Sequence, residues 1–208
     1  MAKILIGATA EELAEEVDGY FMKTDRVWQT MDHAARRLEE AGIEYVVIGG
    51  MALTLHGFAR PTADVDILVS RAGLDQVHID LVGRGFLPTF SGARKSLRDT
   101  KTGVKVDFIT TGEYPGDGKP KAVMFPDPGA TATDRLGYKV IELPRLIELK
   151  LASGLTNPLR LRDLADVQDL IGALSLPRTL AGDINPSVRD EYLRMWDAAA
   201  SARDPQSE

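Results

Sequence analysis

Apolar residues recur along residues 24–41 at the three- and four-residue spacing of an amphipathic helix. One face of this helix would hold five apolar side chains, those of Val27, Met31, Ala34, Ala35 and Leu38. Thr24 stands where an N-cap is expected, and Gly42 follows the last turn. His33 falls beside the apolar face, which predicts a solvated side chain.

Short apolar runs after this helix predict strands, and Gly and Pro residues mark the turns between them. Strands are expected at 45–48, 64–69, 104–110 and 138–143, with edge strands within 86–103. The Gly- and Pro-rich segment 112–134 is expected to be mostly loop. Helices are expected after Gly50, after Ser70, and then at 144–153, 159–174 and 186–200.

Strands and helices alternate in the first half of the chain, whereas helices dominate its end. This order predicts an α/β (α+β) fold with a helical C-terminal part. We expect the α/β core with its N-terminal helices to span residues 1–142, and the helical part to span 143–200. Residues 201–208 are expected to form a disordered tail.

The composition limits the classes of protein to which this chain could belong. With 208 residues, 44% of them hydrophobic, the chain can bury a sizeable core, and the lack of cysteine excludes disulfides and thiolate metal sites. No apolar stretch approaches the roughly 20 residues of a membrane span. The N-terminus lacks a signal-peptide cleavage site, so a cytoplasmic protein is expected. The net charge of −6 disfavours a broad nucleic-acid-binding surface but permits a local contact.

Acidic residues interrupt two of the predicted strands. In the strand at 64–69, Asp64 and Asp66 alternate with apolar residues and therefore point to the same face. Asp107 likewise lies opposite the apolar face of its own strand. Most isolated Asp-x-Asp pairs are helix caps, turns or surface pairs, but here a second strand supplies a matching carboxylate. If the two strands are neighbours, three carboxylates converge.

Three unpaired carboxylates that lie close together repel one another, and one takes up a proton unless a cation lies between them. Mg²⁺ or Mn²⁺ would neutralise Asp64, Asp66 and Asp107 and leave coordination positions for water and substrate phosphates. Two such ions about 3.5–4 Å apart would hold the attacking and leaving oxygens of a phosphoryl-type displacement. The pattern therefore predicts a metal site for phosphate chemistry.

Residues upstream of Asp64 are candidates for contacts with those phosphates. Gly49 and Gly50 lie between a strand and a helix, where glycine lets backbone N–H groups approach a phosphate. An ordinary tight turn is the alternative. Arg60, four residues before Asp64, could reach the same phosphates, and a solvated loop arginine is the other explanation.

A lysine and an aspartate fall on the inward faces of two adjacent predicted helices. Lys150 continues the apolar stripe of the first helix, and Asp163 lies within the apolar arc of the second, with Asp166 at its edge. Because unpaired buried charge is costly, both residues need partners. Two explanations stay open: Lys150 and Asp163 form a structural pair, or Lys150 binds a nucleotide triphosphate and Asp163 holds it in place.

Two stretches carry a resemblance to a known family. "GGMALTLHGFARPTADVDILV" resembles the nucleotidyltransferase superfamily with the polymerase-β-type fold, whose pattern is Gly-Gly or Gly-Ser followed at a short distance by Asp-x-Asp. "LPRLIELKLASGLTNPLRLRDLADVQDLI" is similar to the lysine and R-x-K/R-D-L-x-D signature of the AbiEii/AbiGii-like toxin nucleotidyltransferases and their uncharacterised relatives. Met51 departs from the pattern, because many members carry serine after the glycine.

The resemblance implies a core in which helices flank a mixed sheet. It also implies transfer of a nucleoside monophosphate from an NTP to an acceptor hydroxyl, with release of pyrophosphate. Asp107 would be the third carboxylate and would help deprotonate the acceptor. An RNA 3′ end such as that of tRNA, or a protein hydroxyl, is the implied acceptor, and an antitoxin protein is the implied partner. The alternatives are a small-molecule acceptor, as in antibiotic nucleotidyltransferases, and a catalytically idle nucleotide- or partner-binding module.

Basic residues lead directly into the strand of Asp107. They are Arg94, Lys95, Arg98, Lys101 and Lys105. Lys105 shares a strand face with Asp107, so we expect this basic stretch to border the carboxylate site. It is either a solvated connector or a contact surface for an RNA backbone.

Overall fold

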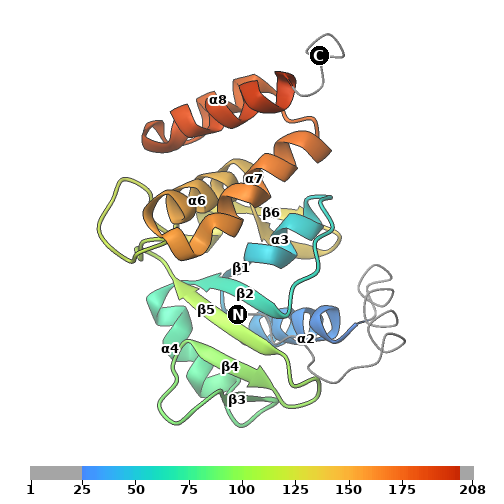
Figure 1. The fold of residues 1–208 in the computed structure, drawn as a ribbon. Helices are drawn as coiled ribbons and strands as arrows, with labels where there is room; N and C mark the ends of the chain where they lie inside the picture. Colours follow the sequence, from blue (N-terminus) through green and yellow to red (C-terminus); the bar gives the residue numbers. More distant parts are fainter. Residues whose placement is uncertain (1–24, 202–208) are drawn as a thin grey trace.

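A mixed sheet of seven strands organises the chain, which the computed structural model describes over residues 25–201 (Figure 1). Its strands are β1 (Tyr45–Ile48), β2 (Asp64–Val69), β3 (Phe86–Pro88), β4 (Ser96–Asp99), β5 (Lys105–Thr110), β6 (Ala132–Arg135) and β7 (Tyr138–Ile141). They lie in the order β3-β4-β5-β2-β1-β7-β6. The pairs β2–β5 and β1–β7 are parallel and the other neighbouring strands are antiparallel, which confirms the predicted α/β class with a mixed sheet.

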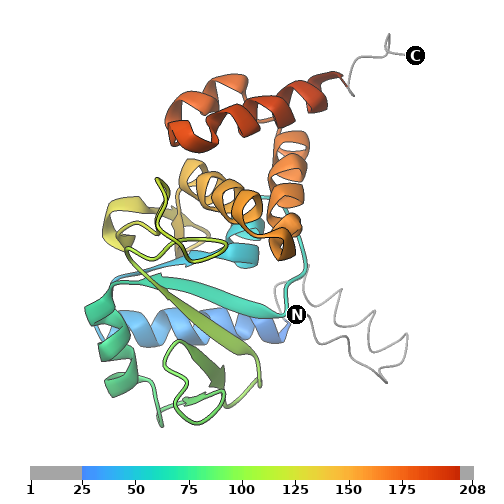
Figure 2. The same cartoon turned by 60° about the vertical axis from the view of Figure 1, so that its left-hand side comes forward.

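Helices cover both sides of this sheet. They are α2 (Arg26–Glu40), α3 (Gly49–Leu55), α4 (Arg71–Asp80), α5 (Pro128–Thr131), α6 (Leu143–Thr156), α7 (Leu161–Ala173) and α8 (Pro186–Ser201), with 3₁₀ turns at Pro158–Arg160 and Arg178–Asp183. Figures 1 and 2 place α2 and α4 on one side of β2 and β5, and α3, α6 and α7 on the other, with α8 outermost. Over residues 25–201, no helix has the length and apolar character needed to cross a bilayer.

The first helix packs as its apolar pattern predicts, but its start and one of its polar residues differ from expectation. All five residues of the predicted stripe are buried. The N-cap is Asp25, whose Oδ1 accepts a hydrogen bond from the Trp28 N–H at 2.9 Å. The predicted cap, Thr24, lies outside the described residues.

The prediction of a solvated His33 was wrong. Its side chain is only 14% exposed, and its Nδ1 lies 2.9 Å from Oδ2 of the fully buried Asp99. The His33 ring also stacks on Phe86, with 4.7 Å between ring centroids. The β3–β4 hairpin, distant in sequence, covers this side of α2 and supplies both contacts.

The edge of the sheet agrees with expectation in most respects. The expected edge strands within 86–103 are β3 and β4, and segment 112–134 is mostly loop as expected, with α5 and the start of β6 at its end. Among the described strands β6 pairs with β7 alone, and most of its residues are exposed. An exposed edge strand needs no apolar run, so the sequence carries no clear signal for it. The division at residue 142 stays a prediction, and residues 202–208 of the expected tail lie outside the described part.

Alternation along β2 separates the core from the candidate site. Val65, Ile67 and Val69 are fully buried, and the side chains of Asp64 and Asp66 project from the opposite face. The Asp66 carboxylate faces α3, because a Cβ on Gly49 at the start of that helix would lie 2.1 Å from Asp66 Oδ2.

Candidate active site

Three carboxylates come from two neighbouring parallel strands. Asp66 of β2 lies opposite Asp107 of β5, and Asp64 lies opposite Lys105. Adjacent strands are about 4.8 Å apart, and residues in register point to the same face. The structure thus places Asp64, Asp66 and Asp107 on one face of two neighbouring strands, as expected if their strands were neighbours.

The electrostatics of Asp66 reflect this crowding. Burial raises the pKa of the Asp66 carboxyl to about 7, and the negative charges of Asp64 and Asp107 contribute to the rise. Lys150 and Lys105 act in the opposite direction but do not cancel it. A further positive charge close by would favour the ionised form of this carboxyl near neutral pH.

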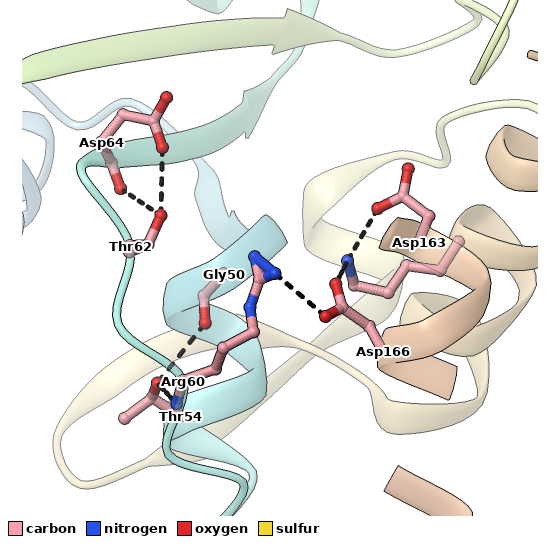
Figure 3. Close-up of polar contacts among 8 residues, drawn as sticks. Gly50, Thr54, Arg60, Thr62, Asp64, Asp163 and Asp166 are labelled. Atoms are coloured by element: carbon pink, nitrogen blue, oxygen red, sulfur yellow. Dashed lines mark hydrogen bonds and ion pairs between the residues drawn. The ribbon is translucent and has the colours of Figure 1, made fainter. Parts of the chain in front are cut away.

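Lys105 supplies a positive charge to the other two carboxylates. Its Nζ donates to Asp107 Oδ2 at 2.5 Å and lies 3.3 Å from Asp64 Oδ2. The second carboxylate oxygen of Asp64 accepts a hydrogen bond of 3.1 Å from the Thr62 hydroxyl, which Figure 3 shows beside it. An ammonium group therefore stands between two of the three candidate metal ligands.

The donor set fits a hard divalent cation in its chemistry. It offers anionic oxygen atoms on one face, as Mg²⁺ and Mn²⁺ require, and the ammonium of Lys105 already stands in for a cation there. Over residues 25–201, no three acidic or histidine side chains are gathered closely enough, in their present rotamers, to hold a metal ion. A metal ion held by Asp64, Asp66 and Asp107 would therefore require these side chains to turn and Lys105 to withdraw.

The two glycines at the start of α3 have a steric reason to be glycine. Gly49 has a φ of +66°, and a Cβ there would lie 2.1 Å from Asp66 Oδ2. A Cβ on Gly50 would lie 2.9 Å from Cβ and Oγ1 of Thr62. The backbone at the start of α3 therefore approaches the carboxylate strand more closely than any side chain would allow.

A network of two cations and two carboxylates joins α6, α7 and the loop before β2. Lys150 Nζ donates to Asp163 Oδ1 at 2.9 Å and to Asp166 Oδ2 at 2.6 Å. Arg60 Nη1 donates to Asp166 Oδ1 at 3.0 Å, and Figure 3 shows Arg60 reaching across to α7. Ser153 donates its hydroxyl to Asp163 Oδ2 at 2.7 Å.

This network differs from expectation in two respects. Arg60, considered for phosphate contact, is paired with Asp166, and Asp166, placed at the edge of the helix face, is only 2% exposed. Asp166 follows Asp163 by three residues and so shares its side of the helix, a spacing that could have identified it. The Lys150–Asp163 contact is present, and Lys150 also lowers the pKa of Asp66, which links the network to the carboxylate site.

The basic stretch before β5 is largely paired with acidic side chains. Arg94 Nη2 lies 2.5 Å from Asp75 Oδ1, and Lys95 forms an ion pair with Glu113. Lys105 borders the carboxylates, as its strand face predicted. Much of the positive charge expected for an RNA backbone is therefore already neutralised.

Comparison with known proteins finds similarity only in structure. No protein-family model matches the chain, and no curated protein matches its sequence. JHP933 from Helicobacter pylori superposes with a TM-score of 0.46 and 16% identity, covering 87% of this chain and 93% of that one. For the antibiotic-resistance factor ANT(2'')-Ia, the TM-score is 0.43 and the identity 10%, covering 83% of this chain and 92% of that one. TM1012 from Thermotoga maritima, provisionally described as a nucleotidyltransferase, has a TM-score of 0.41 and 18% identity, covering 71% and 91% respectively. Similarities of this size carry no conclusion about ligands or activity.

Proposed function

We propose that the chain is a nucleotidyltransferase that uses Mg²⁺ or Mn²⁺ to transfer a nucleoside monophosphate from an NTP to an acceptor hydroxyl. The observation that carries this proposal is the pairing of Asp66 with Asp107 in register across parallel strands, with Asp64 on the same face. The raised pKa of Asp66 supports it, because such a group gains from a bound cation. The resemblance of the Gly-Gly and Asp-x-Asp motifs to the nucleotidyltransferase superfamily supports the same activity.

The residues around the carboxylates have distinct proposed roles. Asp64, Asp66 and Asp107 would hold the metal ions, which would stabilise negative charge on the attacking and leaving oxygens. Gly49 and Gly50 would bring backbone N–H groups to the phosphates. Lys150 would contribute positive charge toward the triphosphate, and Asp163 would hold Lys150 in place. Because Arg60 is paired with Asp166, its contribution to phosphate binding would be indirect, through the position of α7.

The reaction transfers a nucleotidyl group without any redox change. The acceptor oxygen forms a bond to the α-phosphorus while the bond from that phosphorus to the oxygen bridging to the β-phosphate breaks. Asp107 would accept the proton of the acceptor hydroxyl, and pyrophosphate carries away the electron pair of the broken bond. The products are the nucleotidylated acceptor and pyrophosphate.

For the acceptor we propose an RNA 3′ end, such as that of tRNA, in a cytoplasmic enzyme of the AbiEii-like toxin type with a cognate antitoxin. This part rests on the motif resemblance in residues 143–171. The exposed Arg160 and Arg162, next to Asp163 at the start of α7, offer positive charge at the edge of the Lys150 network. They are better placed for an RNA phosphate than Arg94 and Lys95, which have acidic partners.

The test compares transfer from NTPs labelled at the α- and the γ-phosphate, with total RNA, total protein and small hydroxyl compounds as separate acceptor pools. We expect metal-dependent incorporation of the α-label into RNA, no incorporation of the γ-label, and no incorporation with the Asp64→Asn variant. Incorporation of the α-label into protein or a small molecule would support nucleotidyl transfer but contradict RNA as the acceptor. Incorporation of the γ-label, or tight NTP binding without transfer to any pool, would contradict the proposal.

A further inference from the structure

We propose that Lys105 is a built-in counter-cation of the carboxylate site, which holds Asp64 and Asp107 in the metal-free protein and must be displaced before a divalent cation binds. This inference rests on the proposed function, because it concerns the same carboxylates. It adds that Lys105 sets the affinity for the metal ion and couples the binding of the metal ion to the binding of the nucleotide.

The register of the sheet places Lys105 between the carboxylates. Lys105 lies opposite Asp64 on the neighbouring strand and precedes Asp107 by two residues on its own strand, so all three side chains share one face. Its Nζ is 2.5 Å from Asp107 Oδ2 and 3.3 Å from Asp64 Oδ2. A metal ion bound by the same oxygens would compete with this ammonium for both contacts.

Lys105 is able to withdraw without a large penalty. Its side chain is 37% exposed, so the ammonium can turn into water on a flexible four-carbon stem. Lys150, the other lysine near Asp66, is 7% exposed at its side chain and is held between Asp163 and Asp166. Moving Lys150 would leave two carboxylates without their shared partner. Of the two lysines, Lys105 is therefore the one suited to exchange with a metal ion.

Displacement of Lys105 would couple metal binding to nucleotide binding. A divalent cation alone has to break two ion pairs, and the freed ammonium gains only water. When an NTP is present, its phosphates offer the freed ammonium a new anionic partner beside the metal ion. Metal ions should therefore bind weakly without nucleotide and more tightly with it, and this difference should depend on the charge at position 105.

The experiment measures Mn²⁺ binding by calorimetry in the absence of nucleotide, for wild type, Lys105→Met, Lys105→Arg and Lys101→Met. Lys105→Met should bind Mn²⁺ roughly tenfold more tightly than wild type, the size expected for loss of two partly exposed ion pairs. Lys105→Arg keeps the charge and should bind like wild type. Lys101→Met removes an exposed lysine from the β4–β5 turn and is the matched control. A non-hydrolysable NTP should then improve Mn²⁺ affinity more in wild type than in Lys105→Met.

Two results would overturn this inference in distinguishable ways. Mn²⁺ binding that is equal or weaker in Lys105→Met would remove the role of Lys105 and leave the metal site in place. No Mn²⁺ binding by wild type and Lys105→Met alike, with or without nucleotide, would overturn both this inference and the proposed function. Far-ultraviolet circular dichroism of each variant verifies that the folds are equivalent, and Lys105→Gln replaces Lys105→Met if the latter does not fold.

Discussion

Asp66 of β2 and Asp107 of β5 lie side by side in register across two parallel strands, on the face opposite the buried valines and isoleucine of β2. Burial, together with repulsion from Asp64 and Asp107, raises the pKa of Asp66 to about 7. The same residue therefore responds to pH, to bound cations and to the packing of the neighbouring glycines. Each response can be measured separately.

The stability of the metal-free protein should fall as pH rises toward neutrality. Because the pKa of Asp66 is raised to about 7 in the folded state, the folded protein binds this proton more tightly than the unfolded chain does. The resulting stabilisation is fully present below the carboxyl's ordinary pKa and is lost as pH rises through about 7. Thermal unfolding in EDTA between pH 4 and 8 measures this, as the difference between wild type and Asp66→Asn.

The control for this measurement is added Mn²⁺. A metal ion binds the ionised carboxylate, so the rise in melting temperature on adding Mn²⁺ should be larger at pH 8 than at pH 5.5 for wild type. A difference between wild type and Asp66→Asn that does not change with pH would show that Asp66 has an ordinary pKa.

Gly49→Ala should impair transfer far more than stability. The new Cβ would lie 2.1 Å from Asp66 Oδ2, so the carboxylate would have to move, and the left-handed backbone adds a penalty of about 1–2 kcal/mol. Gly42→Ala is a matched control, because Gly42 has a similar φ of +67° with nothing within 4 Å of an added Cβ. Denaturant unfolding should give similar losses for both variants, and the transfer rate should fall only in Gly49→Ala. Equal activity in the two variants would contradict this packing argument.

Lys150 and Asp166 should be energetically coupled. Both side chains are nearly inaccessible. Lys150→Ala leaves Asp166 with Arg60, and Asp166→Ala leaves Lys150 with Asp163, so each single variant leaves buried charge that is only partly compensated. Each should lower the free energy of unfolding by about 3 kcal/mol, the lower end of the range for breaking a buried ion pair. The double variant should lose less than the sum of the two. The exposed pair Arg178–Asp197 serves as a control that should change little. Additive losses, together with unchanged NTP affinity in Lys150→Ala, would exclude both the structural and the nucleotide-binding role.

If RNA is the acceptor, charge reversal at the start of α7 should weaken its binding. Arg160→Glu with Arg162→Glu should reduce RNA affinity and flatten its dependence on salt concentration. Arg94→Glu with Lys95→Glu should have a smaller effect, because Asp75 and Glu113 already neutralise those side chains. Filter binding over a range of salt concentrations distinguishes the two pairs. A larger loss of RNA affinity in Arg94→Glu with Lys95→Glu would instead indicate that RNA contacts the stretch before β5.

Much of the fold follows from local patterns in the sequence. The alternation of aspartate with apolar residues in β2 and β5 predicts which side chains share a face, and the apolar stripe predicts the buried face of α2. These patterns do not predict which residues from distant parts of the chain contact a given side chain. His33 is polar and lies beside its stripe, yet Asp99 and Phe86 of a distant hairpin cover it.

The candidate site is likewise predictable only in part from the sequence. Spacing alone predicts that Asp64 and Asp66 share a face, whereas Asp107 joins them because β5 lies beside β2 in register. The ion pairs that connect them to the rest of the chain are not predictable from spacing, because Arg60 meets Asp166 only when the loop before β2 packs against α7. The steric need for glycine at position 49 likewise depends on the distance between β2 and α3, which no local pattern encodes.

The most direct test of the central claim is metal-dependent transfer from an α-labelled NTP by wild type, Asp66→Asn, Asp107→Asn and Asp169→Asn. The last variant removes an exposed carboxylate on α7 and controls for the loss of one negative charge. We expect wild type and Asp169→Asn to transfer label equally, and Asp66→Asn and Asp107→Asn to be folded and inactive. Without metal, Asp66→Asn should also be at least as stable as wild type at neutral pH. Transfer at the wild-type rate by either Asp66→Asn or Asp107→Asn would contradict the account.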